Sequence, residues 1–442
     1  MSEKNPPRRL DDLYVWFLGD PSHPVYVGAL RLLAAGKGVS LRYSQHWLDN
    51  GFALSEDLPL RDIEFMPVGR DAQRAVGAVD DARPDRWGEK VIRCVDKPRR
   101  LSIMEYLYYA GDDRFGALGI SISPTAYEPR PHGPMPRLAA VQQLSEVAAK
   151  IAASEPISAL EAKIISGGGS PLGGAKPKAL IEMNDEQWII KFYNNEPVDL
   201  PLIEHASMTL ARRAGISVAE TKVIALVGAN ALAIRRFDRQ PGRRIHSISA
   251  GTALRAAAIS GDDPEFGYPA LARILRRIGV NQNDENQQDA HELFRRMVFN
   301  ILIDNTDDHE KNHALLVVSP FKNGRIRLAP AYDIVPTNSG QGYQEFNCGA
   351  DGRDSTLDNA MSQCDAFGLA PDEAGAEVAR VIKVVKTWKE HFRKIGVTPN
   401  DINNLAERID GEPLLLQRTG FDPEKFKSVA PRKKSGSPFK PR

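Results

Sequence analysis

The stretch on which the interpretation of this chain rests is NTDDHEKN, residues 305–312. It places Asp307 and Asn312 at the spacing D-x-x-x-x-N. In phosphoryl transfer by kinases, an Asp at this spacing accepts the proton of the attacking hydroxyl, and the Asn holds a magnesium ion. Mg²⁺ takes only one or two oxygens from protein and completes its octahedral shell with phosphate oxygens and waters. A short polar loop at a helix end therefore suffices for both tasks.

By itself this spacing is weak evidence, because an Asp and an Asn at this distance are expected about once by chance in a chain of this length. The bland alternative is a polar loop after a buried helix. Three other residues strengthen the interpretation. Asp333 follows the next pair of strands, Lys191 lies inside the apolar strand WIIKF, and Glu204 lies on the following helix. Lysine is unfavourable in a strand core unless it is paired, and Glu204 could pair with Lys191; the alternative is that Glu204 only solvates its helix.

The order of these parts along the chain is informative. A glycine-rich loop comes first, followed by the strand lysine, the helix glutamate, a hairpin, the D-x-x-x-x-N loop and a final Asp. The parts of a protein kinase follow one another in the same order. Each part is common singly, but six parts in sequence form a strong joint signal.

The composition places the chain among ordinary globular proteins. Its 442 residues suffice for two or three domains, and 42% are hydrophobic and 26% charged. A net charge of +1 gives no chain-wide reason to expect nucleic acid or a membrane surface as partner. Three scattered cysteines fit a reducing cytosol, and there is neither a signal peptide nor an apolar run of about 18 residues. We therefore expect a cytoplasmic protein.

Apolar periodicity predicts the secondary structure. In the first part of the chain we expect strands at 13–19, 25–30 and 39–43, a helix at 102–111, a proline-rich linker at 123–136, and a helix that buries Leu138, Val141, Leu144, Ala148 and Ile151. In the second part we expect strands at 178–183 and 187–193 around a turn at Asn184-Asp185, a helix at 199–216, a hairpin of 223–228 and 231–237, a helix at 289–304, strands at 314–319 and 325–333, and a helix at 378–392.

These elements predict an α+β, protein-kinase-like, two-lobed fold with an N-terminal β-rich subdomain. We expect the subdomain at 1–122, a β-rich N-lobe region at 137–248 and an α-helical catalytic lobe at 249–424. The end of the chain, residues 425–442, carries seven Lys or Arg and no acidic residue. We interpret it as a solvated, disordered tail, with a nucleic-acid contact as the alternative.

The combination resembles the HipA-type serine/threonine kinase toxins of bacterial toxin–antitoxin systems. The resemblance rests on GGAKPKAL (173–180), WIIKF (188–192), IEHASMTLARRAGI (203–216), IRRFDR (234–239), NTDDHEKNHALL (305–316) and LAPAYDI (328–334). The segments VYVGAL (25–30), SLRYSQHWL (40–48), LPLR (58–61) and GDDRFGAL (111–118) look like the N-terminal subdomain of that family. The resemblance covers nearly the whole chain except the basic tail.

The resemblance implies a role for each matching residue. Asp307 would be the catalytic base, Asn312 and Asp333 the magnesium ligands, and Lys191 the lysine that binds ATP phosphates. The phosphate-side loop would comprise Gly173, Gly174, Ala175, Lys176, Pro177 and Lys178. The backbone of Arg235, Arg236 and Phe237 would contact adenine, Asp238 the ribose, and His309 and Lys311 the phosphates, whereas Tyr332 is either a nucleotide contact or a packing residue.

A regulatory phosphosite is a further expectation. In the family, a serine of the glycine loop can carry an inactivating phosphate. Alignment on GGAKPK puts Pro171 near that position, with Ser170 one residue before it. We therefore expect self-inactivation by phosphorylation at Ser170, or at Ser166.

The resemblance implies an ATP- and Mg²⁺-dependent protein serine/threonine kinase that acts as a toxin and arrests growth. It also implies a helix-turn-helix antitoxin of the HipB type, operator DNA bound through that complex, and an aminoacyl-tRNA synthetase as the protein substrate. Two alternatives remain. A kinase of small hydroxylated metabolites needs the same site residues, and a non-catalytic regulatory pseudokinase is disfavoured because Asp307, Asn312, Asp333 and Lys191 are all present.

Overall fold

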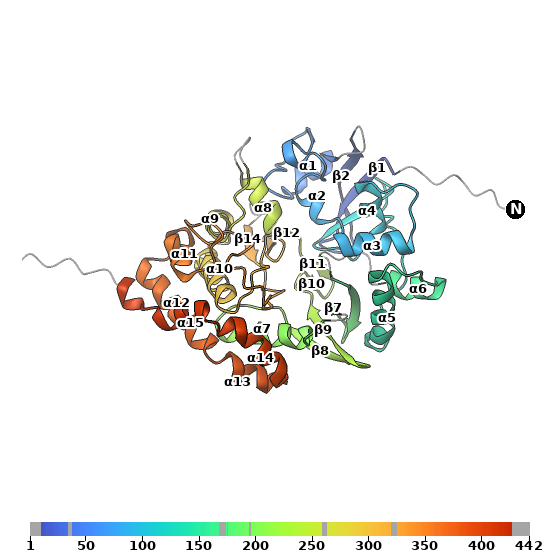
Figure 1. The fold of residues 1–442 in the computed structure, drawn as a ribbon. Helices are drawn as coiled ribbons and strands as arrows, with labels where there is room; N and C mark the ends of the chain where they lie inside the picture. The colour runs from blue at the N-terminus through green and yellow to red at the C-terminus, as the bar shows by residue number, and fades with distance from the viewer. Residues whose placement is uncertain are drawn as a thin grey trace, which may run out of the picture.

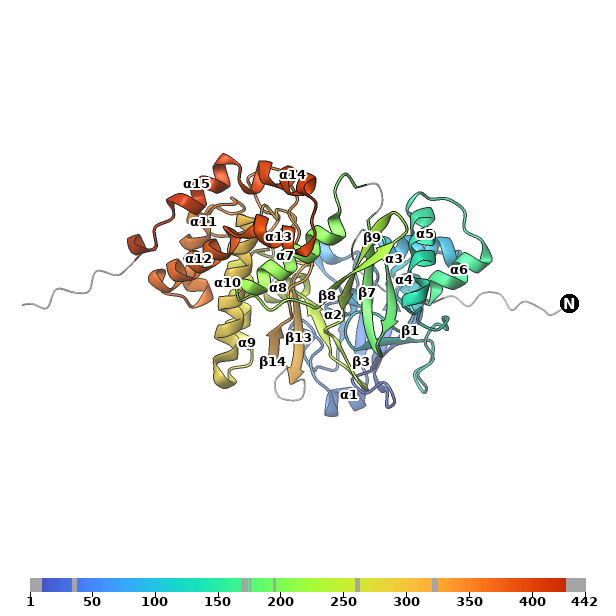
Figure 2. The ribbon, with the colours of Figure 1, turned by 90° about the horizontal axis from the view of Figure 1, so that it is seen from below.

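The computed structural model describes residues 10–33, 38–167, 174, 176–193, 196–258, 263–319 and 325–426. Figures 1 and 2 show three neighbouring regions in this part of the chain: an N-terminal unit in blue, a sheet with flanking helices in green, and a helical region running from yellow to red. The basic tail from residue 427 onward lies outside the described residues, so its predicted disorder stays a prediction.

The N-terminal unit is built on a five-stranded sheet with the order β4-β3-β2-β1-β5. Its strands are β1 (Asp12–Phe17), β2 (Val25–Leu32), β3 (Val39–Tyr43), β4 (Glu64–Phe65) and β5 (Leu118–Ser121). Its helices are α1 (Gln45–Asn50), α2 (Ala78–Asp81), α3 (Arg86–Val95) and α4 (Ile103–Tyr109). Leu13, Leu30 and Leu41, which are paired across β1, β2 and β3, are fully buried. The three predicted strands and the predicted helix of this region are confirmed.

The second sheet has the order β6-β7-β9-β8, and all its pairings are antiparallel. It contains β6 (Lys178–Met183), β7 (Glu186–Phe192), β8 (Thr221–Leu226) and β9 (Ala229–Arg235), with α5 (Val141–Ala152), α6 (Ala159–Ser166) and α7 (Leu200–Arg213) around it. The predicted turn between β6 and β7 is confirmed, because Asn184 and Asp185 both adopt positive φ, 55° and 59°. Asn and Asp tolerate this conformation better than most residues.

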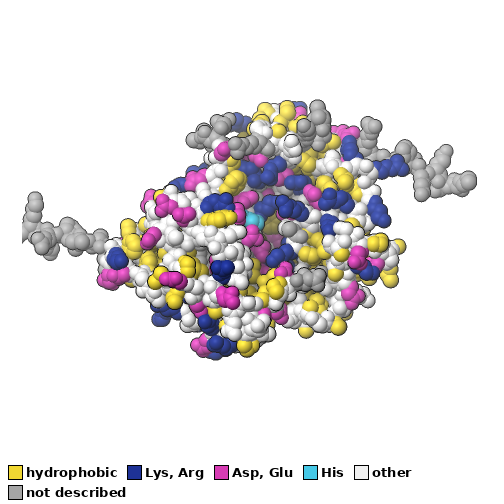
Figure 3. Space-filling view, in the orientation of Figure 1, with side chains coloured by type: hydrophobic (Ala, Val, Ile, Leu, Met, Phe, Trp, Pro, Cys, Tyr) yellow, Lys and Arg dark blue, Asp and Glu magenta, His cyan; other side chains and the backbone are white. Residues whose placement is uncertain are grey.

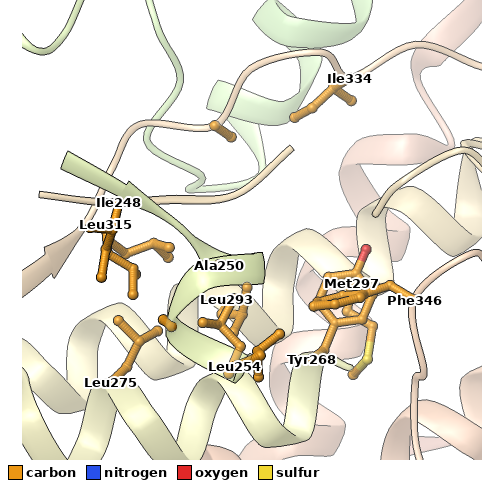
Figure 4. Close-up of a cluster of buried hydrophobic side chains, with 14 of the residues drawn as sticks. Ile248, Ala250, Leu254, Tyr268, Leu275, Leu293, Met297, Leu315, Ile334 and Phe346 are labelled. Atoms are coloured by element: carbon orange, nitrogen blue, oxygen red, sulfur yellow. The ribbon is translucent and has the colours of Figure 1, made fainter. Parts of the chain in front are cut away.

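The helical region surrounds a short sheet, β12-β13-β14, and a two-stranded ribbon, β10-β11, precedes it. The strands are β10 (Arg239–Gln240), β11 (Arg243–Arg244), β12 (Ser247–Ser249), β13 (Ala314–Ser319) and β14 (Arg325–Leu328). The helices are α8 (Ala250–Ala257), α9 (Tyr268–Ile278), α10 (Glu285–Leu302), α11 (Leu357–Ser362), α12 (Pro371–Val385), α13 (Trp388–Ile395), α14 (Pro399–Ile409) and α15 (Glu412–Gly420). Figure 4 shows their shared core, in which Tyr268, Met297 and Phe346 lie against one another beside Leu293 and Leu254.

Three sequence predictions were wrong in detail. The helix expected at 378–392 is two helices, because the chain breaks after Val385 and a new helix starts at Trp388, whose indole nitrogen donates to Asp410 at 3.1 Å. Leu138 is exposed, because it lies in a 3₁₀ turn before α5 rather than on the buried face of that helix. The strand expected at 325–333 ends at Leu328, since Pro330 lacks the N–H that a longer ladder needs.

None of the helices in the described part of the chain combines the length and the hydrophobicity that a membrane span requires.

Candidate active site

A buried lysine ammonium lies between two carboxylates. Lys191, on β7, is only 5% exposed. Its Nζ lies 2.8 Å from Oε1 of Glu204 on α7 and 2.6 Å from Oδ1 of Asp333, which follows β14. Tyr193 donates a hydrogen bond to the second oxygen of Glu204. The predicted pairing of Lys191 with Glu204 is therefore confirmed, and the structure adds Asp333 as a second partner.

Local sequence chemistry positions these groups. Asp199 caps α7 by accepting a hydrogen bond from the backbone nitrogen of Leu202 at 3.2 Å, and Pro201 lies in the first turn. Glu204 therefore follows one turn into the helix, where it is fully buried. Asp333 adopts a left-handed φ of 59°, which Asp tolerates better than larger residues.

The charges of this cluster stabilise one another. Burial alone would lower the pKa of Lys191, but the carboxylates of Asp333 and Glu204 outweigh burial and raise its pKa above the ordinary value. Burial would likewise raise the pKa of Asp333, yet Lys191 and then Lys178 hold that pKa well below its usual range. The lysine is therefore charged and Asp333 ionised at neutral pH.

Two further lysines lie beside this cluster. Lys178, on β6, is paired in register with Lys191, and burial, followed by the charge of Lys191, lowers the pKa of Lys178 to about 8. The Nζ of Lys176 lies 4.7 Å from the ring centroid of Tyr193. A Cβ added at Gly174, whose φ is 89°, would lie only 2.5 Å from Nζ of Lys178. A concentration of positive charge beside a glycine backbone suits a phosphate group.

The loop after α10 carries the predicted base. Asp307 is exposed, and its carboxyl is close enough to Asp333 and Lys176 for their charges to influence its pKa. Partial desolvation, and to a smaller extent Asp333, raise the pKa of Asp307 above its ordinary value, which strengthens it as a proton acceptor. Asn312 is buried and donates from Nδ2 to the backbone oxygen of Asp307 at 3.3 Å.

Asp308, to which the sequence assigned no role, anchors this loop. Its carboxylate is buried and accepts hydrogen bonds from the Tyr268 hydroxyl, from Nδ2 of Asn300 at 3.0 Å and from Nε2 of His313 at 2.8 Å. Burial would raise the pKa of Asp308, but His313 and these hydrogen bonds lower it below the ordinary value. Of the two adjacent aspartates, Asp307 is therefore exposed and Asp308 is buried and holds the loop in place. The sequence carried no signal that distinguishes Asp308 as the buried one.

The side chains of the segment predicted to contact adenine make mainly structural contacts. Arg235 is exposed and pairs with two glutamates of the same sheet region. Arg236 and Asp238 are buried and paired at 2.8 Å. Arg236 also donates to the backbone oxygen of Arg114, and Asp238 accepts from the backbone nitrogen of Gly116, both at 2.8 Å. These side chains attach the N-terminal unit to the second sheet, so the Asp238 carboxylate is already engaged where we expected a ribose contact.

Phe237 and Tyr332, the two aromatic residues of the predicted site, are in contact. The rings of Phe237 and Tyr332 stack with centroids 5.6 Å apart, and the Tyr332 hydroxyl donates to the backbone oxygen of Lys311 at 2.7 Å. Tyr332 therefore contacts both the predicted adenine-side segment, 235–237, which we call the hinge segment, and the loop after α10. The ammonium group of Lys311 pairs with Asp85 at 2.6 Å, while the Nδ1 atom of His309 accepts from the backbone nitrogen of Lys311 at 3.2 Å.

The residues present fit a magnesium ion held together with a nucleotide. Within the described ranges, no three His, Cys, Asp or Glu side chains gather to hold a metal by themselves. Mg²⁺ needs only one or two protein oxygens when phosphates supply others. Asp333 is ionised, and the donor role of Nδ2 in Asn312 assigns the ligand role to its Oδ1. The predicted pair thus has the right chemistry.

Part of the predicted site lies outside the described residues: Gly173, Ala175, Ser170 and Pro171. The remaining loop residues are described. The backbone oxygen of Pro177 accepts from Phe192 at 2.9 Å, and the Ser166 hydroxyl, at the end of α6, donates to the backbone oxygen of Lys163 at 3.0 Å. Phosphorylation of Ser170 or Ser166 stays a prediction.

Figure 3 shows a hollow near the middle of one face, with acidic and histidine side chains inside it and Lys and Arg side chains along its upper margin. Opposite charges at one concave site suit a ligand that binds through both a metal ion and anionic groups.

Comparisons with known proteins give family matches in both the N-terminal and the C-terminal part of the chain. The family model described as HipA-like C-terminal domain matches residues 170–388, and the model described as HipA N-terminal domain matches residues 22–121. The candidate kinase Y4mE of Sinorhizobium fredii is 24% identical over 420 residues, which cover 86% of this chain and 93% of that protein. The candidate kinase Y4dM of the same organism is 33% identical over 165 residues, which cover 34% of this chain and only 37% of Y4dM.

A solved structure shares the fold. The toxin–antitoxin complex of HipA, HipB and operator DNA from Shewanella oneidensis MR-1 contains a chain that matches with a TM-score of 0.63 at 18% identity, over 92% of this chain and 97% of that one. The predicted fold class, a two-lobed α+β fold with an N-terminal β-rich subdomain, is confirmed.

Asp308→Asn should destabilise the protein by about 2–4 kcal/mol, because a buried ionised acceptor of three hydrogen bonds is lost. The lowered pKa of Asp308 means that its contribution is complete at neutral pH and is lost only when acid protonates the carboxylate. Urea unfolding at neutral pH measures the difference. The adjacent Asp307→Asn is the matched control and should change stability by less than about 0.5 kcal/mol. Equal effects of the two substitutions would contradict the assignment of Asp308 as the anchor.

Proposed function

The chain belongs to the HipA family, and we propose that it is an ATP- and Mg²⁺-dependent kinase that phosphorylates serine or threonine hydroxyls of a protein. The observation that carries this proposal is the buried Lys191, which pairs with Glu204 at 2.8 Å and with Asp333 at 2.6 Å. A protein kinase requires both a strand lysine paired with a helix glutamate and a metal-binding aspartate.

The proposed reaction needs no covalent intermediate on the protein. Asp307 orients the substrate hydroxyl and accepts its proton while the oxygen attacks the γ-phosphate and ADP leaves. Lys191, assisted by Lys178 and Lys176, neutralises phosphate charge. Asn312 and Asp333 would hold Mg²⁺, which supplies further charge neutralisation when bound. The raised pKa of Asp307 supports its role as base.

Nucleotide would lie between the lysine cluster and the hinge segment. The backbone of residues 235–237 is proposed to contact adenine, with the stacked rings of Phe237 and Tyr332 as an apolar wall. We leave Asp238 out of the proposed ribose contact, because its carboxylate is buried and bound to Arg236 and Arg239. His309 and Lys311, in the catalytic loop, are proposed to approach the phosphates.

The partners are proposed by analogy with the family. The Shewanella structure contains an antitoxin and operator DNA together with its HipA. We propose that this chain is likewise a toxin that binds a helix-turn-helix antitoxin of the HipB type, and operator DNA through that complex. An aminoacyl-tRNA synthetase is the proposed protein substrate, and incubation of the kinase with labelled ATP and a cell lysate would distinguish protein from small-molecule acceptors.

Asp307→Ala should lower phosphoryl transfer on the order of 10²- to 10⁴-fold while ATP binding and folding are kept, because only the proton acceptor is lost. Radiolabel transfer and growth after overexpression measure the effect: the unaltered chain should arrest growth and Asp307→Ala should not. Glu390→Ala, at an exposed position on α13, is the surface control. Equal toxicity of the unaltered chain and Asp307→Ala would remove the kinase explanation of toxicity.

Asp333→Asn should abolish the dependence of ATP affinity on magnesium, because it removes the only ionised oxygen donor of the proposed metal pair. Calorimetric titration of ATP with and without Mg²⁺ tests this. Asp307→Asn removes a neighbouring carboxylate that is not assigned to the metal and should keep the dependence. The assignment fails if Asp333→Asn and the unaltered chain respond alike to magnesium.

ATP affinity should fall as the pH rises through about 8, by up to about tenfold per pH unit, because burial and Lys191 lower the pKa of Lys178 to about 8. Only the protonated amine attracts phosphate. Lys178→Arg retains its charge over this range and should show a flatter profile. Binding of a fluorescent ATP analogue measures both profiles, and identical profiles would exclude Lys178 as the titrating group.

A further inference from the structure

The N-terminal unit reaches the lysine side of the proposed nucleotide site at the start of α3. Asp85 precedes this helix and Trp87 lies in its first turn. Four hydrogen bonds join these two residues to the segment 174–178 and to Lys311 of the loop after α10, both distant in sequence. The family roles assigned above did not include either residue.

The Asp85 carboxylate joins two segments of the site. Its Oδ2 accepts a hydrogen bond from the backbone nitrogen of Gly174 at 2.9 Å, and its Oδ1 accepts from Nζ of Lys311 at 2.6 Å. Burial would raise the pKa of Asp85, but the charge of Lys311 and these hydrogen bonds lower it below the ordinary value. The carboxylate is therefore ionised when it holds the two segments together.

Trp87 adds contacts that do not depend on charge. Its backbone nitrogen donates to the oxygen of Gly174 at 3.2 Å, and its indole nitrogen donates to the oxygen of Lys178 at 2.7 Å. The side chain is 2% exposed and packs in one core cluster with residues of the second sheet, among them Ala179 and Ile190. The N-terminal unit thus fixes the backbone on both sides of Lys176 and Pro177.

We propose that Asp85 and Trp87 are positioning residues for nucleotide binding, and that the N-terminal unit completes the kinase site. This proposal rests on the proposed function, and it assigns neither residue a contact with the reacting atoms. Asp85 holds the Gly174 backbone and the Lys311 ammonium group in place before ATP arrives. Groups that are already ordered lose less conformational freedom on binding, so the proposed effect is tighter ATP binding rather than faster chemistry.

The experiment measures KM for ATP and kcat separately in the full chain. Asp85→Ala should raise KM for ATP roughly fivefold, the size expected for loss of one net hydrogen-bond contribution, with kcat within about twofold. Asp85→Asn keeps an oxygen that accepts from Gly174 and should have an intermediate KM. Trp87→Phe keeps the packing but removes the indole donor to Lys178, and should also raise KM.

Glu56→Gln provides the matched control. Glu56 also belongs to the N-terminal unit and binds Arg277 of α9 through two contacts of 2.6 and 2.8 Å, at an exposed position. Its loss weakens another attachment of the same unit without touching the glycine-rich segment or the catalytic loop. KM and kcat should both remain as in the unaltered chain.

Hydrogen exchange of the peptide that contains Gly174 to Lys178 gives a second readout that needs no turnover. Exchange should be faster in Asp85→Ala than in the unaltered chain and unchanged in Glu56→Gln. An unchanged KM in Asp85→Ala overturns the proposal. So does a lowered KM, which would mean that the carboxylate competes with phosphate instead of positioning its ligands. A merely structural role would reduce kcat or the active fraction without changing KM.

Failure of the proposed function looks different. If the unaltered chain neither binds nor turns over ATP, the kinase proposal fails, and the nucleotide role of Asp85 fails with it. If the unaltered chain is an active kinase and the Asp85 and Trp87 variants match it in KM and in exchange, only the positioning proposal fails.

Discussion

The burial of one positive charge, on Lys191, constrains the rest of the site. An unpaired ammonium group in the protein interior costs several kcal/mol, so the fold is favourable only when carboxylates meet it. Glu204 comes from α7, which flanks the second sheet, and Asp333 comes from the segment after β14 in the helical region. The Lys191 side chain of the second sheet therefore holds both α7 and that segment in place. The charge that would bind phosphate therefore also forms the Lys191–Asp333 ion pair between the second sheet and the helical region.

In the loop after α10, two adjacent residues, Asp307 and Asp308, separate the exposed proposed base from the buried group that holds the loop. A base must be open to substrate, yet its position must be exact, and an exposed side chain alone cannot fix a loop. Asp308 supplies the fixation through Tyr268, Asn300 and His313, all buried, while Asp307 stays exposed. The free energy that orders the loop thus comes from a carboxylate that takes no part in the proposed chemistry.

Local chemistry made much of this predictable from the sequence. A lysine inside an apolar strand required a partner, and Glu204 on the next helix was a candidate. The dipeptide Asn184-Asp185 predicted a tight turn. Where tertiary contacts outweigh local pattern, the predictions were wrong or incomplete. The helix expected at 378–392 is interrupted between Val385 and Trp388, and the Trp388 indole nitrogen donates to the distant Asp410. Asp307 and Asp308 are chemically identical in sequence, and only the three-dimensional partners of Asp308 distinguish them.

The same reasoning explains why Asp85 and Trp87 were not found. Asp85 is separated by 89 residues from Gly174 and by 226 from Lys311, so no spacing rule connects them. Arg236 and Asp238, expected at the nucleotide, likewise attach the second sheet to the backbone of the N-terminal unit. Contacts between residues so far apart in sequence form only when the regions have assembled, because the entropy lost on closing the long intervening chain must be offset by other contacts between those regions. The proposed phosphate-binding geometry is therefore a property of the assembled chain. The second sheet and helical region without the N-terminal unit would retain the lysine–carboxylate cluster but lose the contacts of Asp85 with Gly174 and Lys311.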